Sequence, residues 1–329
     1  MPKAPLSLLL LAATIAASAN AHAQVCGATV YRSMALTADM VCPAGIDGIV
    51  VGDHNVRIDL NGYNITGPNS GATRGVVSSG FDAVKIVGPG RITGFFTSVR
   101  IDSGDKHEIR DIDTVAFGYG ISLLNTSGSV VETSRVGFMG LGSDPGFVAN
   151  ANRIVGNDAD SIHLYGCDTS GNEIANNRIH PLTQFTAVSL FDGVSNTLIA
   201  ANRIATGTVF LASSSDNLVT DNIIDNTAPS WIYAGVLMAG LPSSCARGAP
   251  VDATRNVVRG NTIIGGPVGV HMAAGSPRNK IVDNKIYDQL IAGMRFLVGS
   301  DYNDAHSNTY RHLSPAVGVM DLGIGNVWP

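Results

Sequence analysis

Hydrophobic and polar residues alternate in a series of short segments along the chain. In "SIHLY", for example, the apolar residues Ile162 and Leu164 stand two positions apart, with variable residues beside them. The same spacing recurs in "SVRID", "GISLL", "AVSLF", "TVFLA", "GVLMA", "GVHMA" and "GMRFL". A period of two is that of a β-strand with one buried face. The pattern therefore predicts short strands that recur along the chain.

A second motif, N-x-I-x-x-N-x-I, follows most of these segments. It occurs as "SVVETSRV" (129–136), "FVANANRI" (147–154), "NEIANNRI" (172–179), "TLIAANRI" (197–204), "NLVTDNII" (217–224), "NVVRGNTI" (256–263) and "NKIVDNKI" (279–286). Its second polar position is held by Ser134, Asn152, Asn177, Asn202, Asn222, Asn261 and Asn284. A repeat of about 18 to 25 residues is typical of a solenoid. Asparagine tolerates the left-handed conformation of a sharp bend and can bond to asparagines in neighbouring coils.

These two motifs together predict three short strands per coil. Coils stacked in parallel, roughly 4.8 Å apart, pair every backbone group with the coil above or below. Inward Ile, Val and Leu side chains then form one continuous core. A helical fold is excluded because Gly, Asn and β-branched residues crowd every window, and a two-sheet sandwich does not require one repeated asparagine.

The composition agrees with a turn-rich β protein. The acidic residues are 23 Asp and 3 Glu, Gly accounts for 38 of 329 residues, and only 14% of residues are charged. Long helices favour Glu and Lys, whereas turns favour Asp, Asn and Gly. The net charge of -5 gives no support to nucleic-acid binding.

The first residues carry the pattern of a secretory signal peptide. Lys3 precedes the apolar run "LSLLLLAATIAA", and Ala21-His22-Ala23 supplies a small-residue cleavage site. We expect residues 1–23 to be removed and the mature chain to be secreted, to the periplasm or the medium. No later apolar run reaches the roughly 18 residues of a membrane span, so no membrane insertion is expected.

Four cysteines in an exported chain suggest two disulfides. Cys26 and Cys42 flank a short loop at the N-terminal end, and Cys167 and Cys245 remain. The segment 240–255 is an insertion on the side of the coils where Cys167 lies, about 14 Å from it by coil spacing. That insertion could bridge the distance, so we expect the pairs Cys26–Cys42 and Cys167–Cys245.

The repeat resembles that of the right-handed parallel β-helix family, the pectate-lyase-like proteins with short tandem repeats that occur among secreted carbohydrate-active proteins. The segment "TADMVCPAGIDGIVVGDHNVRIDLNGYNITG" is similar to the start of such bacterial proteins, where a cysteine-bracketed cap leads to a strand and D-L-N-G. The resemblance covers residues 26 to 310 and implies an all-β solenoid. We expect about ten coils: a disulfide-closed cap over about 24–55, coils over about 56–310 and a C-terminal tail over 311–329.

In this family the substrate groove lies on the outer face of the sheet built from the alternating strands. The first outward column reads Arg100, Ser122, Gly140, His163, Ser189, Phe210, Leu237, His271 and Arg295. The second reads Asp102, Leu124, Gly142, Tyr165, Phe191, Ala212, Ala239, Ala273 and Leu297. Two longer loops, 180–186 and 226–233, enter this sheet from one side and add polar and aromatic residues.

Candidate site residues follow from this placement. We expect His163 and Tyr165, with the nearby Asp158 and Asp160, to be the catalytic group, since His, Tyr and Asp serve in proton transfer. The expected substrate-binding residues are Phe191, Phe210, Trp231, Tyr233, His180, His271 and Arg295, because exposed aromatic rings stack on sugars. Packing beneath the loops for the phenylalanines, and an ordinary surface pair for His163 and Tyr165, are the alternative readings.

A column of Arg135, Arg153, Arg178 and Arg203 is expected just after the repeated asparagine position. Stacked like charges are unfavourable by about 1 kcal/mol per neighbouring pair in water. A polyanion could bind them, but a solvated face with Asp or carbonyl partners is the simpler interpretation.

Three functions remain open. A uronate lyase needs a base, an acid and a group that neutralises the carboxylate. His163 and Tyr165 could serve as base and acid, and Arg100 or Arg295 could neutralise the carboxylate. The fit is loose, because Arg100 lies three coils from His163. A glycosidase needs two facing carboxyl groups, for which Asp158, Asp160 and Asp192 are candidates, but the polygalacturonase motifs are missing. The calcium aspartates of pectate lyases and the D-P-H of alginate epimerases are missing too.

We therefore expect a secreted polysaccharide lyase-like protein that cleaves an acidic polysaccharide by β-elimination, with non-catalytic glycan binding or surface adhesion as the alternative. A glycoside hydrolase with an Asp pair is the third interpretation. The expected partner is a polysaccharide or a surface glycan. No metal ligands are assigned, and calcium is the one cofactor left open.

Overall fold

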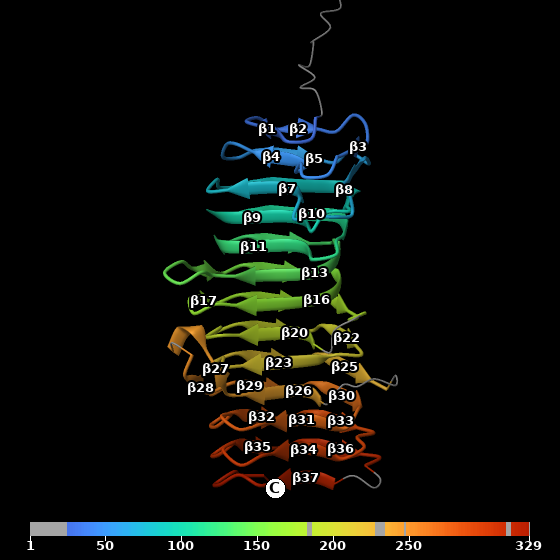
Figure 1. The fold of residues 1–329 in the computed structure, drawn as a ribbon. Coiled ribbons are helices and arrows are strands. Elements are labelled where there is room, and N and C mark those ends of the chain that lie inside the picture. Colours follow the sequence, from blue (N-terminus) through green and yellow to red (C-terminus); the bar gives the residue numbers. More distant parts are fainter. Residues whose placement is uncertain (1–24, 183–185, 228–233, 247, 314–316, 329) are drawn as a thin grey trace, which may run out of the picture.

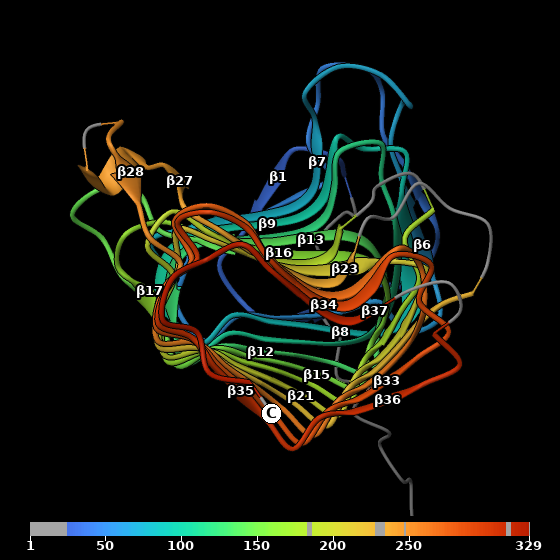
Figure 2. The ribbon, with the colours of Figure 1, turned by 90° about the horizontal axis from the view of Figure 1, so that it is seen from below.

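Three parallel sheets wind around a common axis in the computed structural model, which describes residues 25–182, 186–227, 234–246, 248–313 and 317–328. Successive coils stack from the blue N-terminal end to the red C-terminal end (Figure 1). Seen along the axis, the three sheets form the sides of a triangle (Figure 2). Buried side chains fill its interior. The fold is an all-β parallel solenoid, as expected.

The first sheet consists of the alternating strands and carries the predicted groove. Its strands are β1 (Ala28–Val30), β4 (Ile49–Val51), β7 (Arg74–Ser79), β9 (Thr97–Asp105), β11 (Tyr119–Ser127), β13 (Arg135–Gly142), β16 (Asp158–Tyr165), β20 (Thr186–Phe191), β23 (Thr208–Ala212), β26 (Ala234–Ala239), β31 (Val268–Met272), β34 (Ala292–Phe296) and β37 (Val317–Asp321). Each pairs in parallel with the next.

The second sheet follows the first within each coil. Its strands are β2 (Met34–Ala35), β5 (Arg57–Asp59), β8 (Lys85–Thr93), β10 (Glu108–Val115), β12 (Val130–Glu132), β15 (Arg153–Val155), β18 (Glu173–Ala175), β21 (Leu198–Ala200), β24 (Leu218–Thr220), β29 (Val257–Arg259), β32 (Lys280–Val282) and β35 (Asp304–His306).

The third sheet completes each coil. It contains β3 (Met40–Val41), β6 (Asn64–Thr66), β19 (Arg178–Ile179), β22 (Arg203–Ala205), β25 (Ile223–Asn226), β30 (Thr262–Gly265), β33 (Lys285–Tyr287) and β36 (Thr309–Arg311). The ends of β8 and β10 and the beginnings of β13 and β16 also lie in it, because these long strands run around a corner. Outside the three sheets lie the pair β14 (Ala149–Asn150) and β17 (Thr169–Ser170), the pair β27 (Leu241–Pro242) and β28 (Pro250–Val251), and the 3-10 helix η1 (Ser244–Ala246).

The solenoid has about 12 turns, slightly more than the ten expected. The three sheets extend from Ala28 in β1 to Asp321 in β37. Strands therefore occupy segments at both ends that lack a clear copy of the repeated motif, and these strands account for the additional coils.

The core forms as the alternation predicts. Ile162 and Leu164 are completely buried, whereas His163 and Tyr165 between and beside them are only partly buried. The same inward pattern of Ile, Val, Leu and Met continues through one cluster along the whole axis. Because each strand buries one face, the outward residues of the first sheet are placed in register from coil to coil.

Two asparagine ladders stabilise the corners on either side of the second sheet. One runs through Asn157, Asn177, Asn202, Asn222, Asn261, Asn284 and Asn308, with Ser134 above it. The other includes Asn152 and Asn172, and then Asn217, Asn256, Asn279, Asn303 and Asn326. In these asparagine-to-asparagine steps the side-chain amide donates to the side-chain carbonyl oxygen of the asparagine in the next coil, except that Asn279 donates to Asn303 through its backbone N–H. These bonds satisfy buried polar groups.

Three sequence expectations about the ladder are corrected. Asn152 is level with Asn172 rather than Asn177, because Arg153 pairs with Glu173. The charged column on the third sheet therefore contains Asp158 in place of Arg153, between Arg135 and Arg178. This arrangement separates Arg135 from Arg178, whereas Arg178 and Arg203 remain neighbours.

The third correction concerns the bend. The residue with a left-handed backbone precedes the ladder asparagine, as Asn176 (φ 56) precedes Asn177 and Ala201 (φ 53) precedes Asn202. The ladder asparagine itself is left free to bond along the stack.

Two disulfides join the expected cysteines. Cys26 and Cys42 close the N-terminal end with Cα atoms 5.5 Å apart, and Cys167 is bonded to Cys245 with Cα atoms 5.4 Å apart. The second bond attaches the insertion that carries β27 and β28, which projects at one corner (Figure 2). Within the described ranges, no helix is long and apolar enough to span a membrane.

Candidate functional site

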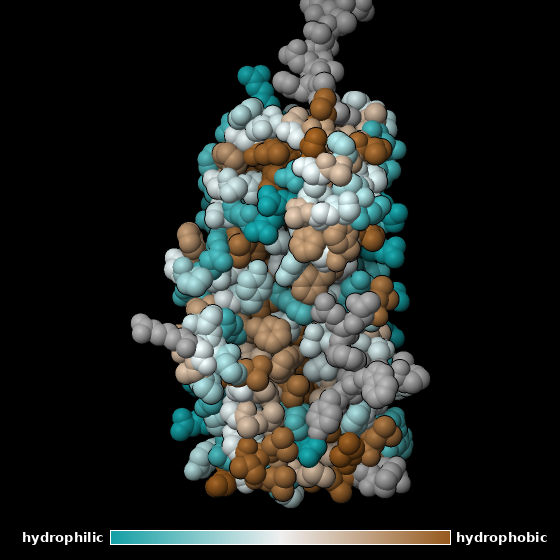
Figure 3. All heavy atoms as spheres, viewed as in Figure 1, coloured by the Kyte–Doolittle hydropathy of each residue, from teal (hydrophilic) through white to brown (hydrophobic). Residues whose placement is uncertain are grey.

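The outer face of the first sheet carries the outward column in the register expected. Parallel pairing places Arg100, Ser122, Gly140, His163, Ser189, Phe210, Leu237, His271 and Arg295 on successive coils. The second column, from Asp102 through Tyr165 and Phe191 to Ala239, is also in register. Hydrophobic side chains gather along the middle of this face (Figure 3).

A track of rings runs along this face across neighbouring coils. Tyr119 contacts Phe138 with ring centroids 4.6 Å apart, and Phe138 contacts His163 at 4.5 Å. The track continues from His163 to Phe191 at 6.3 Å and from Phe191 to Phe210 at 5.3 Å. We call these five residues the aromatic track. His163 is its central member and the one member with ring nitrogen atoms.

The environment of His163 keeps its imidazole neutral. Burial lowers the pKa of His163 from its ordinary value of 6.5 to about 4. Its Nε2 atom is buried and has no hydrogen-bond partner among the described residues. A buried polar atom without a partner is costly and often marks a functional position. At neutral pH this atom carries a proton in one tautomer and a lone pair in the other.

The lowered pKa predicts an acid-sensitive stability. The unfolded chain binds a proton at His163 below about pH 6.5, whereas the folded chain resists it until about pH 4, so stability is present above this window and is lost as the pH falls through it. We expect the free energy of unfolding to fall by about 1 to 2 kcal/mol from this group between roughly pH 7 and pH 5. Urea denaturation of the wild type and of His163→Phe at both pH values measures this. An equal loss in the two proteins would contradict the assignment.

The ring of Tyr165 packs against a glycine of the preceding coil. A Cβ atom added to Gly142 would lie 2.6 Å from the ring of Tyr165, and one at Gly140 would lie 2.7 Å from the ring of Tyr119. Both rings therefore rest directly on the backbone of β13. Burial raises the pKa of Tyr165, Tyr119 adds to this, and the Arg100 guanidinium opposes it. The hydroxyl of Tyr165 is consequently protonated at neutral pH.

Gly142→Ala should displace this ring. We expect a loss of about 1 to 2 kcal/mol in the free energy of unfolding, because the added methyl group overlaps the Tyr165 ring. In a Tyr165→Ala background the same substitution should cost almost nothing, since the overlapping atoms are gone. Denaturation of the four proteins of this double-mutant cycle measures the coupling. Equal costs in both backgrounds would mean that the ring does not rest on Gly142.

Arg100 is occupied by a partner on its own strand. Its Nε atom donates to both carboxylate oxygens of Asp102, at 3.0 and 2.8 Å. That hydrogen bond raises the pKa of Arg100. The sequence placed Arg100 too far from His163 for direct cooperation. The charge of Arg100 nevertheless acts on Tyr165. The Tyr165 ring rests on Gly142 in the preceding coil, which lies nearer to Arg100.

Asp158 and Asp160 form a separate cluster with His180 on the outer face of the third sheet. The Nε2 atom of His180 contacts Asp158 Oδ1, and its Nδ1 atom lies 3.9 Å from Asp160 Oδ1. Burial raises the pKa of Asp160, while His180 and Arg135 oppose the rise. The two carboxylates thus flank one imidazole. A glycosidase pair needs two carboxyl groups that face each other across an open groove, and Asp158 and Asp160 are not arranged in that way.

The other expected residues are spread along the sheet. His271 is almost fully buried, with a pKa lowered to about 4 by burial and then by Arg295, and Arg295 follows it on the next coil. Both lie four or five coils from His163, roughly 19 to 24 Å away. Trp231 and Tyr233 lie outside the described residues. In the part of the chain that is described, no group of three His, Cys, Asp or Glu side chains is arranged to hold a metal ion.

Tyr119 and Phe138 of the aromatic track were not predicted from the sequence. Each precedes its first alternating apolar residue by one or two positions, at the corner where the third sheet leads into the first. A signal was present, because Gly140 and Gly142 occupy both outward columns and leave room for rings of adjacent coils. Small residues in a column were not interpreted as space for a neighbour.

The coils, the ladders and the continuous core together define a parallel β-helix. The family model for the right handed beta helix region matches residues 137–310, which is 174 of 329 residues, and the chain belongs to this family.

Comparison with solved structures shows the same fold. The periplasmic alginate epimerase AlgG superposes with a TM-score of 0.57 at 13% identity, covering 87% of this chain and 77% of that one. A DFA-IIIase from Arthrobacter chlorophenolicus A6 without its lid superposes with a TM-score of 0.53 at 14% identity, covering 87% and 88%. At these identities the likeness is one of fold. No curated protein sequence matches the chain.

Proposed function

We propose that the protein is an exported, carbohydrate-active β-helix protein that binds an acidic polysaccharide on the first sheet and cleaves it by β-elimination. The observation that carries this proposal is the neutral imidazole of His163 in the middle of the aromatic track, whose Nε2 atom has no hydrogen-bond partner among the described residues. The two disulfides agree with an oxidising compartment. The similarity to an alginate epimerase supports the choice of a polysaccharide.

The chemistry assigns one role to each polar group of the site. His163 Nε2 takes the proton from the carbon next to the uronate carboxylate, the bond to the leaving glycosidic oxygen breaks, and a carbon–carbon double bond forms. Tyr165, whose raised pKa keeps its hydroxyl protonated, donates a proton to the leaving oxygen. A bound carboxylate favours the charged imidazole and raises the pKa of His163, so the base strengthens when substrate is present.

A second function, glycan binding without cleavage, is favoured by a specific observation. The described cation that acts on Tyr165, Arg100, is already paired with Asp102. A lyase needs a positive group or hydrogen-bond donors to neutralise the substrate carboxylate. If the Arg100–Asp102 pair stays closed with substrate bound, the aromatic track holds the glycan without elimination.

The test is direct. The purified mature protein is incubated with homopolymers of mannuronate, guluronate, galacturonate and glucuronate, with calcium and with a chelator in separate series. The ultraviolet absorbance of unsaturated products reports β-elimination. Absorbance that grows with time supports cleavage. Retention in gels that contain the same polymers, without any absorbance change, supports the binding function instead. If no polymer of the panel is cleaved and none retains the protein, both proposed functions are overturned.

A further inference from the structure

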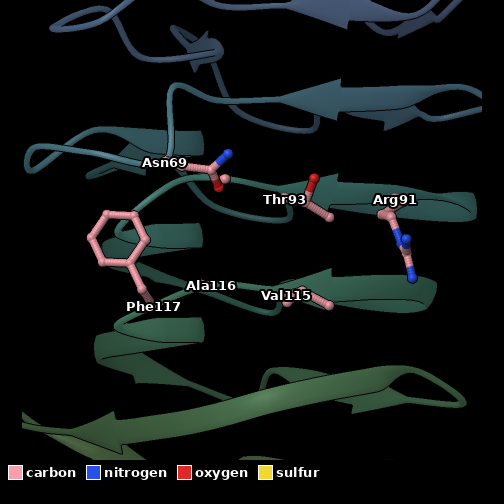
Figure 4. Close-up of a pocket in the computed structure, with 7 residues that line it drawn as sticks. Asn69, Arg91, Thr93, Val115, Ala116 and Phe117 are labelled. Carbon is pink, nitrogen blue, oxygen red and sulfur yellow. The ribbon is translucent and has the colours of Figure 1, made fainter.

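A cavity lies at the corner between the third and first sheets, outside the groove described above. It has a volume of about 330 Å³ and spans three consecutive coils. Asn69 belongs to the loop before β7, Arg91 and Thr93 to the end of β8, and Val115 and Phe117 to the end of β10 and the turn after it (Figure 4). Phe117 and Arg91 lie at opposite sides of this cavity, with Thr93 between them.

The apolar wall of the cavity is exposed. Phe117 is 54% exposed and Val115 is 50% exposed. Phe96, 42% exposed, contacts Phe117 edge to face with ring centroids 5.6 Å apart. An exposed ring beside a concave polar wall is the arrangement that binds the apolar face of a sugar while its hydroxyls reach hydrogen-bond partners.

The polar wall is fixed by an ion pair. The Nε and Nη2 atoms of Arg91 donate to Asp113 Oδ2 at 3.1 and 2.7 Å, which holds the guanidinium in place. The Nη1 atom is not part of this pair. Asp113 restricts the rotamers of Arg91 but also offsets part of its charge, so Nη1 is the atom from which Arg91 would donate to a ligand carboxylate. The cavity is thus lined by a ring, a cation, an amide and a hydroxyl.

The cavity also lies next to the aromatic track. Phe117 is two residues from Tyr119, where the track begins. The rings of Phe96 and Phe117 therefore extend the line of aromatic side chains around the corner of the solenoid. A polysaccharide chain that occupies the track can continue into this corner.

We propose that this corner cavity is a second saccharide-binding site, in which Phe117 stacks on one residue of a polyuronate and Arg91 binds a carboxylate of the same chain. The proposal rests on the proposed function for its ligand class. It adds a site that binds the polymer away from His163 and lengthens the stretch of chain that the protein recognises.

The experiment measures retention of the full mature chain in native gels containing a polyuronate. Phe117→Ala should weaken retention about tenfold, because one stacking ring is lost. Phe147→Ala is the matched control, since Phe147 is also 54% exposed but lies on another loop. Arg91→Gln should weaken retention by the polyuronate and should have little effect with the same polymer after carboxyl reduction.

The outcomes separate this inference from the proposed function. If Phe117→Ala and Phe147→Ala are retained equally, the corner cavity is not a binding site, whatever the cleavage assay shows. If Phe117→Ala is weakened but no unsaturated product forms, the cavity binds glycan and the lyase function fails. A wild-type protein that no polyuronate retains overturns the cavity site together with the proposed function.

Discussion

Replacing His163 by phenylalanine should reduce cleavage of the polyuronate at least about a hundredfold, because a general base contributes roughly 10² to 10⁴ in rate. Phenylalanine keeps a ring between Phe138 and Phe191 and removes only the nitrogen atoms. It also removes a buried polar atom without a described partner, so the fold should be retained. The measurement is the initial rate of absorbance increase, with retention in polymer gels as the parallel measure of binding.

His271→Phe is the matched control for this experiment. His271 lies in the same outward column, four coils away, and its pKa is lowered to about 4 as well. We expect the His271 variant to keep its turnover rate, although its affinity can change if the substrate extends that far. A His163 variant that cleaves as fast as the wild type would remove Nε2 from the mechanism. A loss of retention with the loss of cleavage would point to binding.

Replacing Asn202 by alanine should lower the free energy of unfolding by about 3 to 5 kcal/mol. The Asn202 amide donates to the Ile174 carbonyl oxygen and to Asn222 Oδ1, both at 2.9 Å. Its own Oδ1 atom accepts from the backbone and side-chain amides of Asn177, at 2.9 and 3.0 Å. All of these groups are buried, so the truncation leaves donors and acceptors of two neighbouring coils without partners.

Arg203→Ala provides the comparison for Asn202. Arg203 is the next residue and its side chain is exposed on the third sheet, so the change should stay within about 0.5 kcal/mol. Urea denaturation followed by far-ultraviolet circular dichroism gives both values. Similar values for the two variants would show that the ladder contributes shape to the corner but little stability.

Two sequence patterns, the alternation within a strand and the repetition of the motif, predicted where His163 lies on the solenoid. Alternation with a period of two predicted that His163 and Tyr165 point outward, because successive side chains of a strand point to opposite faces and Ile162 and Leu164 are buried. Repetition of the motif then placed Ser189 below His163 without any coordinates. Both steps are local and both were correct.

The assignment of Asn152 failed for an equally local reason. The motif contains two asparagines five residues apart, and both of them form ladders in this fold. A window over 147–154 therefore resembles one over 152–159, and the residues alone do not choose between them. The pairing of Arg153 with Glu173 across the coils decides it.

The sequence by itself determined the solenoid, the direction of the alternating side chains and the order of the two outward columns along the first sheet, because these follow from short periodicities that the coils repeat. Only the tertiary structure decided which groups meet. It separated Asp158 and Asp160 from His163 by a corner, closed Arg100 onto Asp102, and laid Tyr165 on Gly142. It also formed the corner cavity, whose walls come from segments that are adjacent only after the coils stack. Contacts between coils depend on ring orientation and on corner geometry. Neither repeats regularly along the chain, so a periodic sequence pattern does not predict them.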